Sequence, residues 1–309
     1  MKKLFLSVFV LAGIALIAIY IFIPANIKLV NTVFIKTKPA VVNRLLMDET
    51  KWTKWLSPDS IYSEHSFRFK NYDYDFLNSV MNSATVLISG NQKPINSLIS
   101  VIPVNEDSIA VEWKAATDAG VNPITRIKSY NEAKNLKKDM GDILDKLHIF
   151  LNKKQNAYGL NITEQRVVDT ILISTKLFSN NFPTTGEIYS LINKLQNYIF
   201  SQGAKETNPP MLNIIKDEGS YRAMVAIPVN RVLRETNNYS FKRMIPGRIL
   251  VAEVTGGDYT AMQAINQLDL YISDNHMSSP AIPFQSLITD RSNQPDTTKW
   301  ITKIYYPVY

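Results

Sequence analysis

The chain has 309 residues, with 34 basic side chains against 27 acidic ones for a net charge of +7, and it contains no cysteine. This length accommodates roughly two domains of ordinary size, each able to bury its own core. The absence of cysteine excludes disulfides, thiol catalysis and cysteine-based zinc or iron–sulfur sites.

The first predicted element is an apolar helix. Leu4 to Ile23 carries no charged residue, and about 20 apolar residues suffice to cross the hydrocarbon region of a bilayer. A cleavable signal peptide is the alternative, but its apolar region is usually about 7 to 15 residues long. We therefore expect residues 1–25 to form a transmembrane anchor in the lipid bilayer.

Lys2 and Lys3 favour an inside N-terminus, which places the rest of the chain on the extracytoplasmic, periplasmic side. Basic residues on the other flank leave this orientation open.

The next segments predict an antiparallel sheet. Apolar and β-branched runs separated by turn residues indicate strands, which we expect at Ile27–Ile35, Phe67–Phe76, Ala84–Ser89, Ile95–Val104 and Ser108–Ala115. Pro39 opens a short helix, Ala40–Leu46, because proline is tolerated in a first helical turn. A polar loop with Trp52 and Trp55 follows this helix.

A long amphipathic helix is predicted over about Ser129–Asn152. Its apolar residues recur at steps of three and four, as one buried helix face requires, at Leu136, Met140, Ile143, Leu144, Leu147 and Leu151. The many lysines of this helix alternate with acidic residues, which favours a solvated face over a patch for nucleic acid or lipid headgroups. No helix-turn-helix pattern adjoins it, and we expect no nucleic-acid partner.

Residues 27–155 resemble the START-like (SRPBCC) polyketide cyclase and lipid-transfer superfamily. The resemblance is carried by "NTVFIKTKPAVVNRLLMDETKWTKW" from Asn31 and by the long helix. It implies a helix-grip fold, in which a curled sheet grips the helix around a cavity for an apolar ligand. Trp52 and Trp55 are then candidates for gating ligand entry, and a simple packed loop is the alternative.

Residues 156–166 are predicted to be a polar linker, and the rest of the chain, residues 167–309, repeats one β-α-β-β pattern twice. The first copy has strands at Val167–Phe178, Met211–Lys216 and Tyr221–Val229, and the second begins with a strand at Arg248–Thr255 and ends at Pro307 and Val308. A longer polar stretch, Arg291 to Lys299, distinguishes the second copy. Two such halves are expected to bury their apolar faces together and to leave a groove where they meet.

One helix is predicted in each copy. Thr184 and Glu187 form a capping-box signature, and the helix that follows places Ile188, Leu191, Ile192, Leu195 and Ile199 on one face. Gly256, Gly257 and Asp258 turn the chain and cap the second helix, which is expected to direct Met262, Ile265, Leu268 and Ile272 inward.

Residues 167–309 resemble the GyrI-like effector-binding domain, also called the SOUL or bacterial-activator ligand-binding fold. The matching residues are "IPGRILVAEVTGGDYTAMQAINQLDLYI" from Ile245, Pro283-Phe284-Gln285, and "WITKIYYPV" from Trp300. The resemblance implies a pocket between the halves that is lined by aromatic rings and often holds a glutamate. This sequence has Gln285 there, and a neutral amide can orient a ligand but cannot act as a general base.

The candidate ligand-binding residues follow from these two resemblances. In the C-terminal half they are Tyr221, Tyr259, Phe284, Gln285, Trp300 and Tyr305, and in the N-terminal half they are Trp52 and Trp55. The alternative for each aromatic ring is a place in the core. Glu253 is the nearest upstream carboxylate, and an exposed strand position fits it equally well.

The sequence shows no motif for common catalytic chemistry. His65, His148 and His276 are far apart, without the spacing of metal ligands, and no phosphate-binding loop or nucleophile elbow is present. We therefore expect no catalytic residue, no metal and no cofactor.

The sequence as a whole predicts an α+β, membrane-anchored, non-catalytic protein that binds hydrophobic or aromatic small molecules. The alternatives are a hydrolase of electrophilic small molecules on the same scaffold and a protein-interaction module of the cell envelope. Transcriptional regulation ranks last, because it requires a DNA-binding element.

Overall fold

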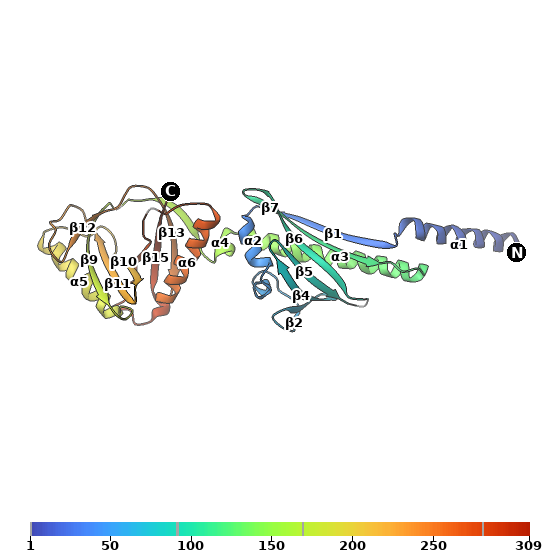
Figure 1. Cartoon of the computed structure of the whole chain (residues 1–309), viewed down its shortest axis with the longest axis horizontal. Helices are drawn as coiled ribbons and strands as arrows, with labels where there is room; N and C mark the ends of the chain where they lie inside the picture. The colour runs from blue at the N-terminus through green and yellow to red at the C-terminus, as the bar shows by residue number, and fades with distance from the viewer. Residues whose placement is uncertain (1, 91–92, 169, 280) are drawn as a thin grey trace. The chain divides into compact units, whose positions relative to one another are not determined.

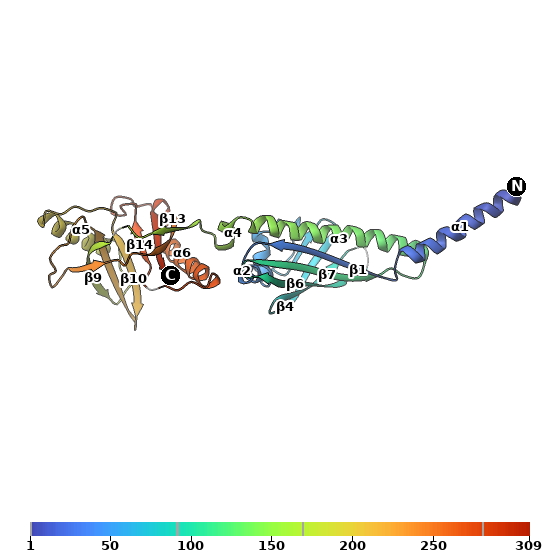
Figure 2. The same cartoon turned by 90° about the horizontal axis from the view of Figure 1, so that it is seen from above.

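The computed structural model describes residues 2–90, 93–168, 170–279 and 281–309. The fold is α+β with two antiparallel sheets, as expected, and the chain divides into two compact units between Lys153 and Lys154. Each unit consists of one sheet with helices packed against it (Figures 1 and 2).

The sheet of the N-terminal unit has seven strands in the order β1-β7-β6-β5-β4-β3-β2. Their bounds are β1 (Asn26–Ile35), β2 (Ser60–Ile61), β3 (Ser66–Phe69), β4 (Tyr72–Val80), β5 (Ser83–Ser89), β6 (Ile95–Asn105) and β7 (Ser108–Asp118). The helices are α1 (Lys2–Phe22), α2 (Pro39–Leu46), the 3₁₀ helix η1 (Glu49–Lys54) and α3 (Pro123–Leu151). β1, the first strand of the chain, lies at one edge of the sheet and pairs antiparallel with β7, the last strand of this unit. The strands from β2 to β7 follow one another as in a meander.

The long helix α3 lies along one face of this sheet (Figure 2). It begins at Pro123 instead of the predicted Ser129, because Asn122 caps it by accepting a hydrogen bond from the Ile124 N–H at 2.8 Å. All six of the apolar residues predicted to face inward on this helix are buried. The period of the sequence therefore identified the correct helix face, whereas the cap set the true start.

The expectation of a membrane anchor at Leu4 to Ile23 is wrong. Among the residues that the structure describes, no helix combines the length and the apolar character needed to cross a bilayer. This finding also contradicts the predicted single-pass localisation and removes the basis for assigning a side of the membrane.

The last turn of α1 is fixed to the start of α3. The Tyr20 hydroxyl donates to the Val121 carbonyl at 2.7 Å, and the Arg126 Nε donates to the Ile23 carbonyl at 2.7 Å. The Arg126 guanidinium also lies 4.8 Å from the centre of the Tyr20 ring. These contacts satisfy the buried Arg126 side chain with a carbonyl at the end of α1.

The sheet of the C-terminal unit has eight strands in the order β12-β9-β11-β10-β14-β15-β13-β8. Their bounds are β8 (Ile162–Arg166), β9 (Ile171–Ser179), β10 (Met211–Asp217), β11 (Ser220–Pro228), β12 (Ser240–Arg243), β13 (Arg248–Thr255), β14 (Phe284–Leu287) and β15 (Ile301–Val308). The helices are α4 (Lys154–Tyr158), α5 (Thr185–Ser201), α6 (Asp258–Asp274) and the 3₁₀ helix η2 (Thr297–Lys299).

Two β-α-β-β halves form this sheet, β9-α5-β10-β11 and β13-α6-β14-β15. They meet through β10 and β14, where Met211 is opposite Ser286 and Leu212 is opposite Gln285. The segment predicted to be a linker, 156–166, holds most of α4 and the edge strand β8, which pairs with β13.

Each half has its own core between its helix and one face of the sheet. The α5 core includes Leu195 and Val225, and the α6 core includes Leu268 and Ile304. The capping box of Thr184 and Glu187 at the start of α5 is confirmed. Met262 of α6 was predicted to face inward, which is wrong: its side chain is 52% exposed. Ala261 and Ala264 take that face, since small residues bring the helix close to the sheet.

Candidate functional site

The main pocket of the C-terminal unit lies on the sheet face opposite α5 and α6, which we call the open face. Side chains on a strand alternate between faces, so Leu172 and Met224 lie on the open face while their neighbours Ile173 and Val225 join the α5 core. The pocket has a volume of about 400 Å³, within the range of about 300–1,000 Å³ that is typical of small-molecule sites.

The floor of the pocket is apolar. Leu172, Met211 and Ala226 form a buried cluster here, and Met244 and Phe284 pack against it. Leu172, Met211, Ala226 and Phe284 come from β9, β10, β11 and β14, so the floor includes the seam between the two halves. Methionine side chains are flexible and polarisable, which lets such a floor adapt to ligands of different shape.

A strap, residues 244–247, crosses from β12 to β13 and forms one wall of the pocket. It is held by the Met244 N–H, which donates to the Thr170 carbonyl at 3.0 Å, and by the Gly247 carbonyl, which accepts from the Val167 N–H at 3.0 Å. Ile245 in the strap is 67% exposed although it lines the pocket. The strap therefore adds the exposed apolar side chain of Ile245 to the lining of the pocket.

Basic side chains surround this apolar floor. The charged side chains among the described lining are those of Lys176, Lys242, Arg243 and Arg248, and no described lining residue has an acidic side chain. Arg248 is neutralised by a two-bond contact with Glu164, at 2.6 and 2.7 Å, which also raises the pKa of the Arg248 guanidinium above its usual value. The other three have no ion pair within the described part of the chain.

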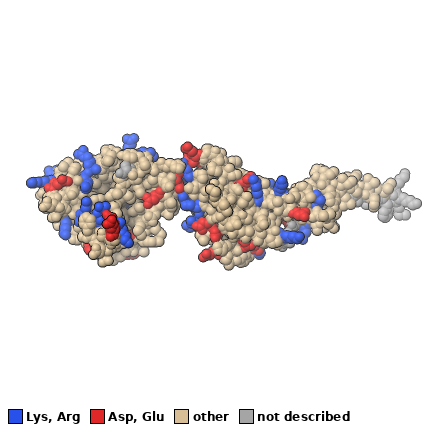
Figure 3. Space-filling model, viewed as in Figure 1, with Lys and Arg blue, Asp and Glu red and all other residues tan. Residues whose placement is uncertain are grey.

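The rest of the surface is mixed in charge. In the view of Figure 3, Lys and Arg side chains are spread over the C-terminal unit with Asp and Glu side chains between them. On the open face itself, Glu253 of β13 is opposite Lys303 of β15, and their charged groups are 3.6 Å apart. The all-basic set around the pocket is therefore a local feature.

Of the predicted ligand-binding residues, Phe284 lines the pocket. Its ring stacks on that of Tyr305, with centres 5.1 Å apart and planes 8° apart, and the two residues are opposite each other on β14 and β15. Tyr305 thus packs beside Phe284 on the neighbouring strand without lining the pocket itself. Ligand contact by either ring stays a prediction.

Gln285 lies on the other side of the sheet. It is opposite Leu212 on one neighbouring strand and Ile304 on the other, which belong to the α5 and α6 cores. The side chain is buried, and its Oε1 has no hydrogen-bond partner among the described residues. Since Gln285 sits where the two helix-side cores meet, its amide is not placed to touch a ligand on the open face.

The other three aromatic candidates of this unit also lie away from the pocket. Tyr221 packs edge-on against Phe182 at 5.6 Å, near the start of β11. Tyr259, in the first turn of α6, is 68% exposed. Trp300 is buried, donates to the Gln294 carbonyl at 2.7 Å and lies 4.7 Å from the Arg291 guanidinium.

Trp52 and Trp55 are packed in the core of the N-terminal unit. Both are buried, and their indole N–H groups donate to the Leu46 and Leu45 carbonyls at 3.0 and 3.4 Å. The Trp52 ring lies 5.2 Å from that of Trp55 and 5.5 Å from that of Phe67. A cavity of only about 20 Å³ adjoins Trp52, so the structure brings the two rings together as packed groups.

The space between α3 and its sheet is mostly filled. The cavity described there, beside Tyr72 and Leu136, has a volume of about 20 Å³, roughly that of one water molecule. A larger groove of about 540 Å³ lies near the start of α3 and is lined by polar residues that include Asn96 and Lys128. It lacks the apolar floor that distinguishes the pocket of the C-terminal unit.

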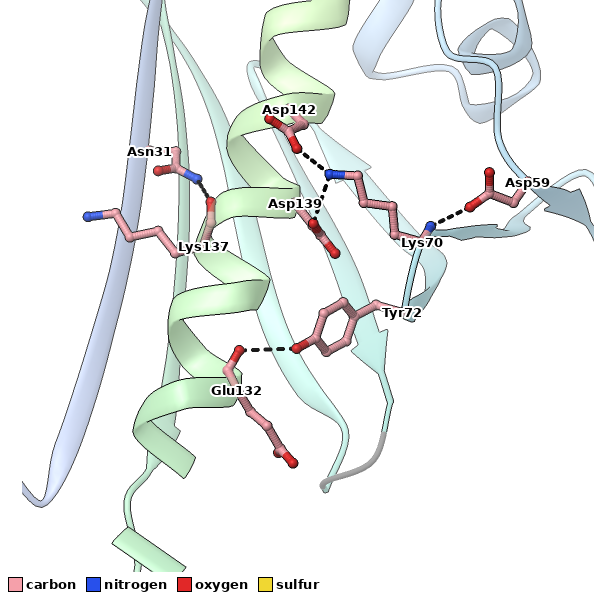
Figure 4. Close-up of polar contacts among 8 residues, drawn as sticks. All are labelled: Asn31, Asp59, Lys70, Tyr72, Glu132, Lys137, Asp139 and Asp142. Carbon is pink, nitrogen blue, oxygen red and sulfur yellow. Dashed lines mark hydrogen bonds and ion pairs between the residues drawn. The ribbon is translucent and has the colours of Figure 1, made fainter. Parts of the chain in front are cut away.

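A polar cluster joins α3 to the β3–β4 turn (Figure 4). Lys70 donates to Asp139 at 3.1 Å and also pairs with Asp142, which raises the pKa of the lysine. The Tyr72 hydroxyl donates to the Glu132 carbonyl at 3.0 Å. Burial, followed by the nearby Asp139 charge, raises the pKa of the Tyr74 hydroxyl well above its usual range. The cluster fixes the helix to the sheet edge.

The described residues contain no group of three or more side chains suited to hold a metal ion. His148 contacts the Phe34 carbonyl at 2.9 Å, and His65 pairs with Glu49 at 2.7 Å. Both histidines therefore have local partners instead of a shared ligand.

Sequence reasoning missed the basic residues and methionines of the pocket. Lys176 is four residues after Leu172 on β9, so strand alternation places both on one face. The spacing of Leu172 and Lys176 is visible in the sequence, but which face of the sheet they share depends on the side that α5 covers. Lys242 and Arg243 lie on β12, a short edge strand that the sequence pattern did not reveal.

Comparisons with known proteins give fold likenesses of low score. No family model matches the chain, and no curated protein matches it. Among solved structures, it is similar to the C-terminal domain of EcmrR, at 18% identity over 48% of this chain and 98% of that one, with a TM-score of 0.42.

Two further structures are similar to parts of this chain. A hydrolase from Listeria innocua matches at 10% identity, over 48% of this chain and 92% of that one, with a TM-score of 0.37. A protein solved bound to tetraphenylphosphonium matches at 15% identity, over 48% and 94%, with a TM-score of 0.33. Because all three TM-scores lie below 0.5, the assignment of the site rests on the geometry of the pocket.

Proposed function

We propose that this protein binds small apolar or aromatic molecules, without transforming them, in the open-face pocket of its C-terminal unit. The observation that carries the proposal is the pocket of about 400 Å³ over the floor of Leu172, Met211, Ala226, Met244 and Phe284. An apolar cavity with a few polar groups at its edge is the usual form of a small-molecule site.

The lining also supports binding without catalysis. Its described polar side chains are Asn213, Tyr309 and the four basic residues, and no serine, histidine or carboxylate is among them. Asn213 is already engaged, because its Nδ2 donates to the Pro283 carbonyl at 2.8 Å. A hydrolase needs a nucleophile or a base within reach of the substrate. The described lining offers only its lysines and Tyr309 for such a role, which favours binding over hydrolysis.

The doubled β-α-β-β arrangement supports assignment of the C-terminal unit to the GyrI-like type of effector-binding domain. In the N-terminal unit, the antiparallel sheet with α3 along it supports the helix-grip type. We assign ligand binding to the C-terminal unit, because the cavity under α3 is small.

The proposal is tested with a neutral apolar dye, N-phenyl-1-naphthylamine, whose emission rises in an apolar environment. Ala226→Trp is expected to weaken dye binding at least about tenfold, because an indole added to the pocket floor fills the space that the dye occupies. Because Ala226 is buried as well as lining the pocket, thermal unfolding of the variant checks that it folds.

Met262→Trp is the matched control, because it adds the same ring at an exposed position of α6. This comparison matters since exposed apolar residues of α1, such as Phe9 and Ile21, can also take up dye. Equal dye affinity for wild type and Ala226→Trp, measured by fluorescence titration, contradicts the proposal.

A further inference from the structure

We propose that the open-face pocket selects amphipathic organic anions, meaning an apolar or aromatic body that carries a carboxylate, sulfonate or similar group. This inference rests on the proposed function and adds the sign of the ligand's charge. The observation behind it is the set of basic residues around the pocket, where no described lining residue has an acidic side chain.

Two of these residues are lysines that adjoin the apolar floor directly. Lys176 on β9 is opposite Met224 on β11, and Lys242 on β12 is opposite Leu172 on β9. Residues opposite each other on paired strands have their Cβ atoms about 5 Å apart. A ligand whose body lies on Met224 or Leu172 therefore has an ammonium group within reach of its head.

The positive charges of these two lysines are not neutralised by an ion pair with a described residue. Lys176 and Lys242, with the adjacent Arg243, have no ion pair to any described residue, in contrast to Arg248. An apolar cleft lined by one sign of charge raises the local concentration of the opposite ion, because its low-dielectric walls reduce screening. The lining therefore favours anions and disfavours cations of equal shape.

The test uses two probes of the same shape and opposite charge, tetraphenylborate and tetraphenylphosphonium, titrated calorimetrically into the full chain at low salt. We expect tetraphenylborate to bind about tenfold more tightly, as two unpaired cations near the pocket imply. In Lys176→Gln/Lys242→Gln, the borate affinity should fall, the phosphonium affinity should rise, and the ratio of the two should drop about tenfold.

The ratio is compared with that of a control variant, Lys194→Gln/Lys205→Gln, which removes the same charge at positions outside the pocket lining. A ratio that responds equally in both variants, or a wild type that prefers the phosphonium, overturns the inference. If both probes bind with equal affinity and Ala226→Trp abolishes both, the inference fails while the proposed function stands. If neither probe binds, the inference fails, and the dye titration alone decides the proposed function.

Discussion

Among single residues, Gln285 lies away from the pocket in which the family resemblance predicted it. The sequence places it directly after Phe284, which lines the pocket, yet the pleat of β14 turns consecutive side chains to opposite faces. The amide therefore lies between Leu212 and Ile304, with its Oε1 buried and unbonded among the described residues. Gln285 therefore packs between the two helix-side cores, although it follows a pocket residue in the sequence.

Gln285→Glu is expected to destabilise the fold by about 2–4 kcal/mol at pH 7 without creating hydrolytic activity, because it buries a carboxylate between two apolar cores. Burial raises the pKa of the introduced glutamate in the folded state. The loss should therefore be small below about pH 4.3, where the unfolded chain also holds the proton, and should grow as pH rises.

Urea unfolding across this pH range measures the effect, with Gln285→Met as the control. The methionine variant removes an unbonded buried oxygen and is expected to be as stable as the wild type or more stable. A glutamate variant that keeps full stability at pH 7 and hydrolyses an electrophilic ester would show that this side chain reaches the open face instead.

Among single elements, hydrophobic periodicity predicted the interior elements and the edge strand β1, and it missed both edge strands of the C-terminal sheet. The helix faces of α3 and α5 and the central strands follow from apolar spacing, because those residues are buried on a regular period. The edge strands β8 and β12 carry mostly polar or exposed residues, so neither shows a strand pattern. Their positions depend on backbone pairing with β13 and β9, which sequence spacing does not encode.

The edge strand β8 gives a direct test of where the C-terminal unit begins. A fragment of residues 154–309 is expected to fold, and a fragment of residues 167–309 should be less stable by about 2 kcal/mol or more, the contribution of one buried aromatic side chain. The shorter fragment loses β8, the Glu164–Arg248 pair and the buried Tyr158, whose hydroxyl donates to Asp274 at 2.9 Å.

Thermal and urea unfolding of the two fragments measure this difference. Equal stability would mean that residues 154–166 add nothing to the fold, in agreement with the linker that the sequence alone predicted at residues 156–166. Dye binding by the longer fragment, with an affinity close to that of the full chain, is expected in the same experiment because every described lining residue lies within it.

At the scale of the whole molecule, the sequence predicted two antiparallel α+β parts and a doubled C-terminal half, and the structure has both. The predicted groove between the halves also corresponds to a pocket whose floor spans the seam. Its lining could not be predicted, because a one-residue shift in strand register exchanges the faces of every side chain. The transmembrane expectation rested on the charge-free run alone.

A methyl carbon-13 spectrum of the nine methionines, recorded during titration with tetraphenylborate, shows which part of the chain binds the ligand. Met211, Met224 and Met244 line the pocket, whereas Met81 and Met140 belong to the N-terminal unit and Met262 is exposed on α6. If the ligand binds in the open-face pocket, the first three signals shift together along one saturating curve while the others stay in place. Stationary pocket signals with shifts at Met81, Met140 or Met262 would contradict it.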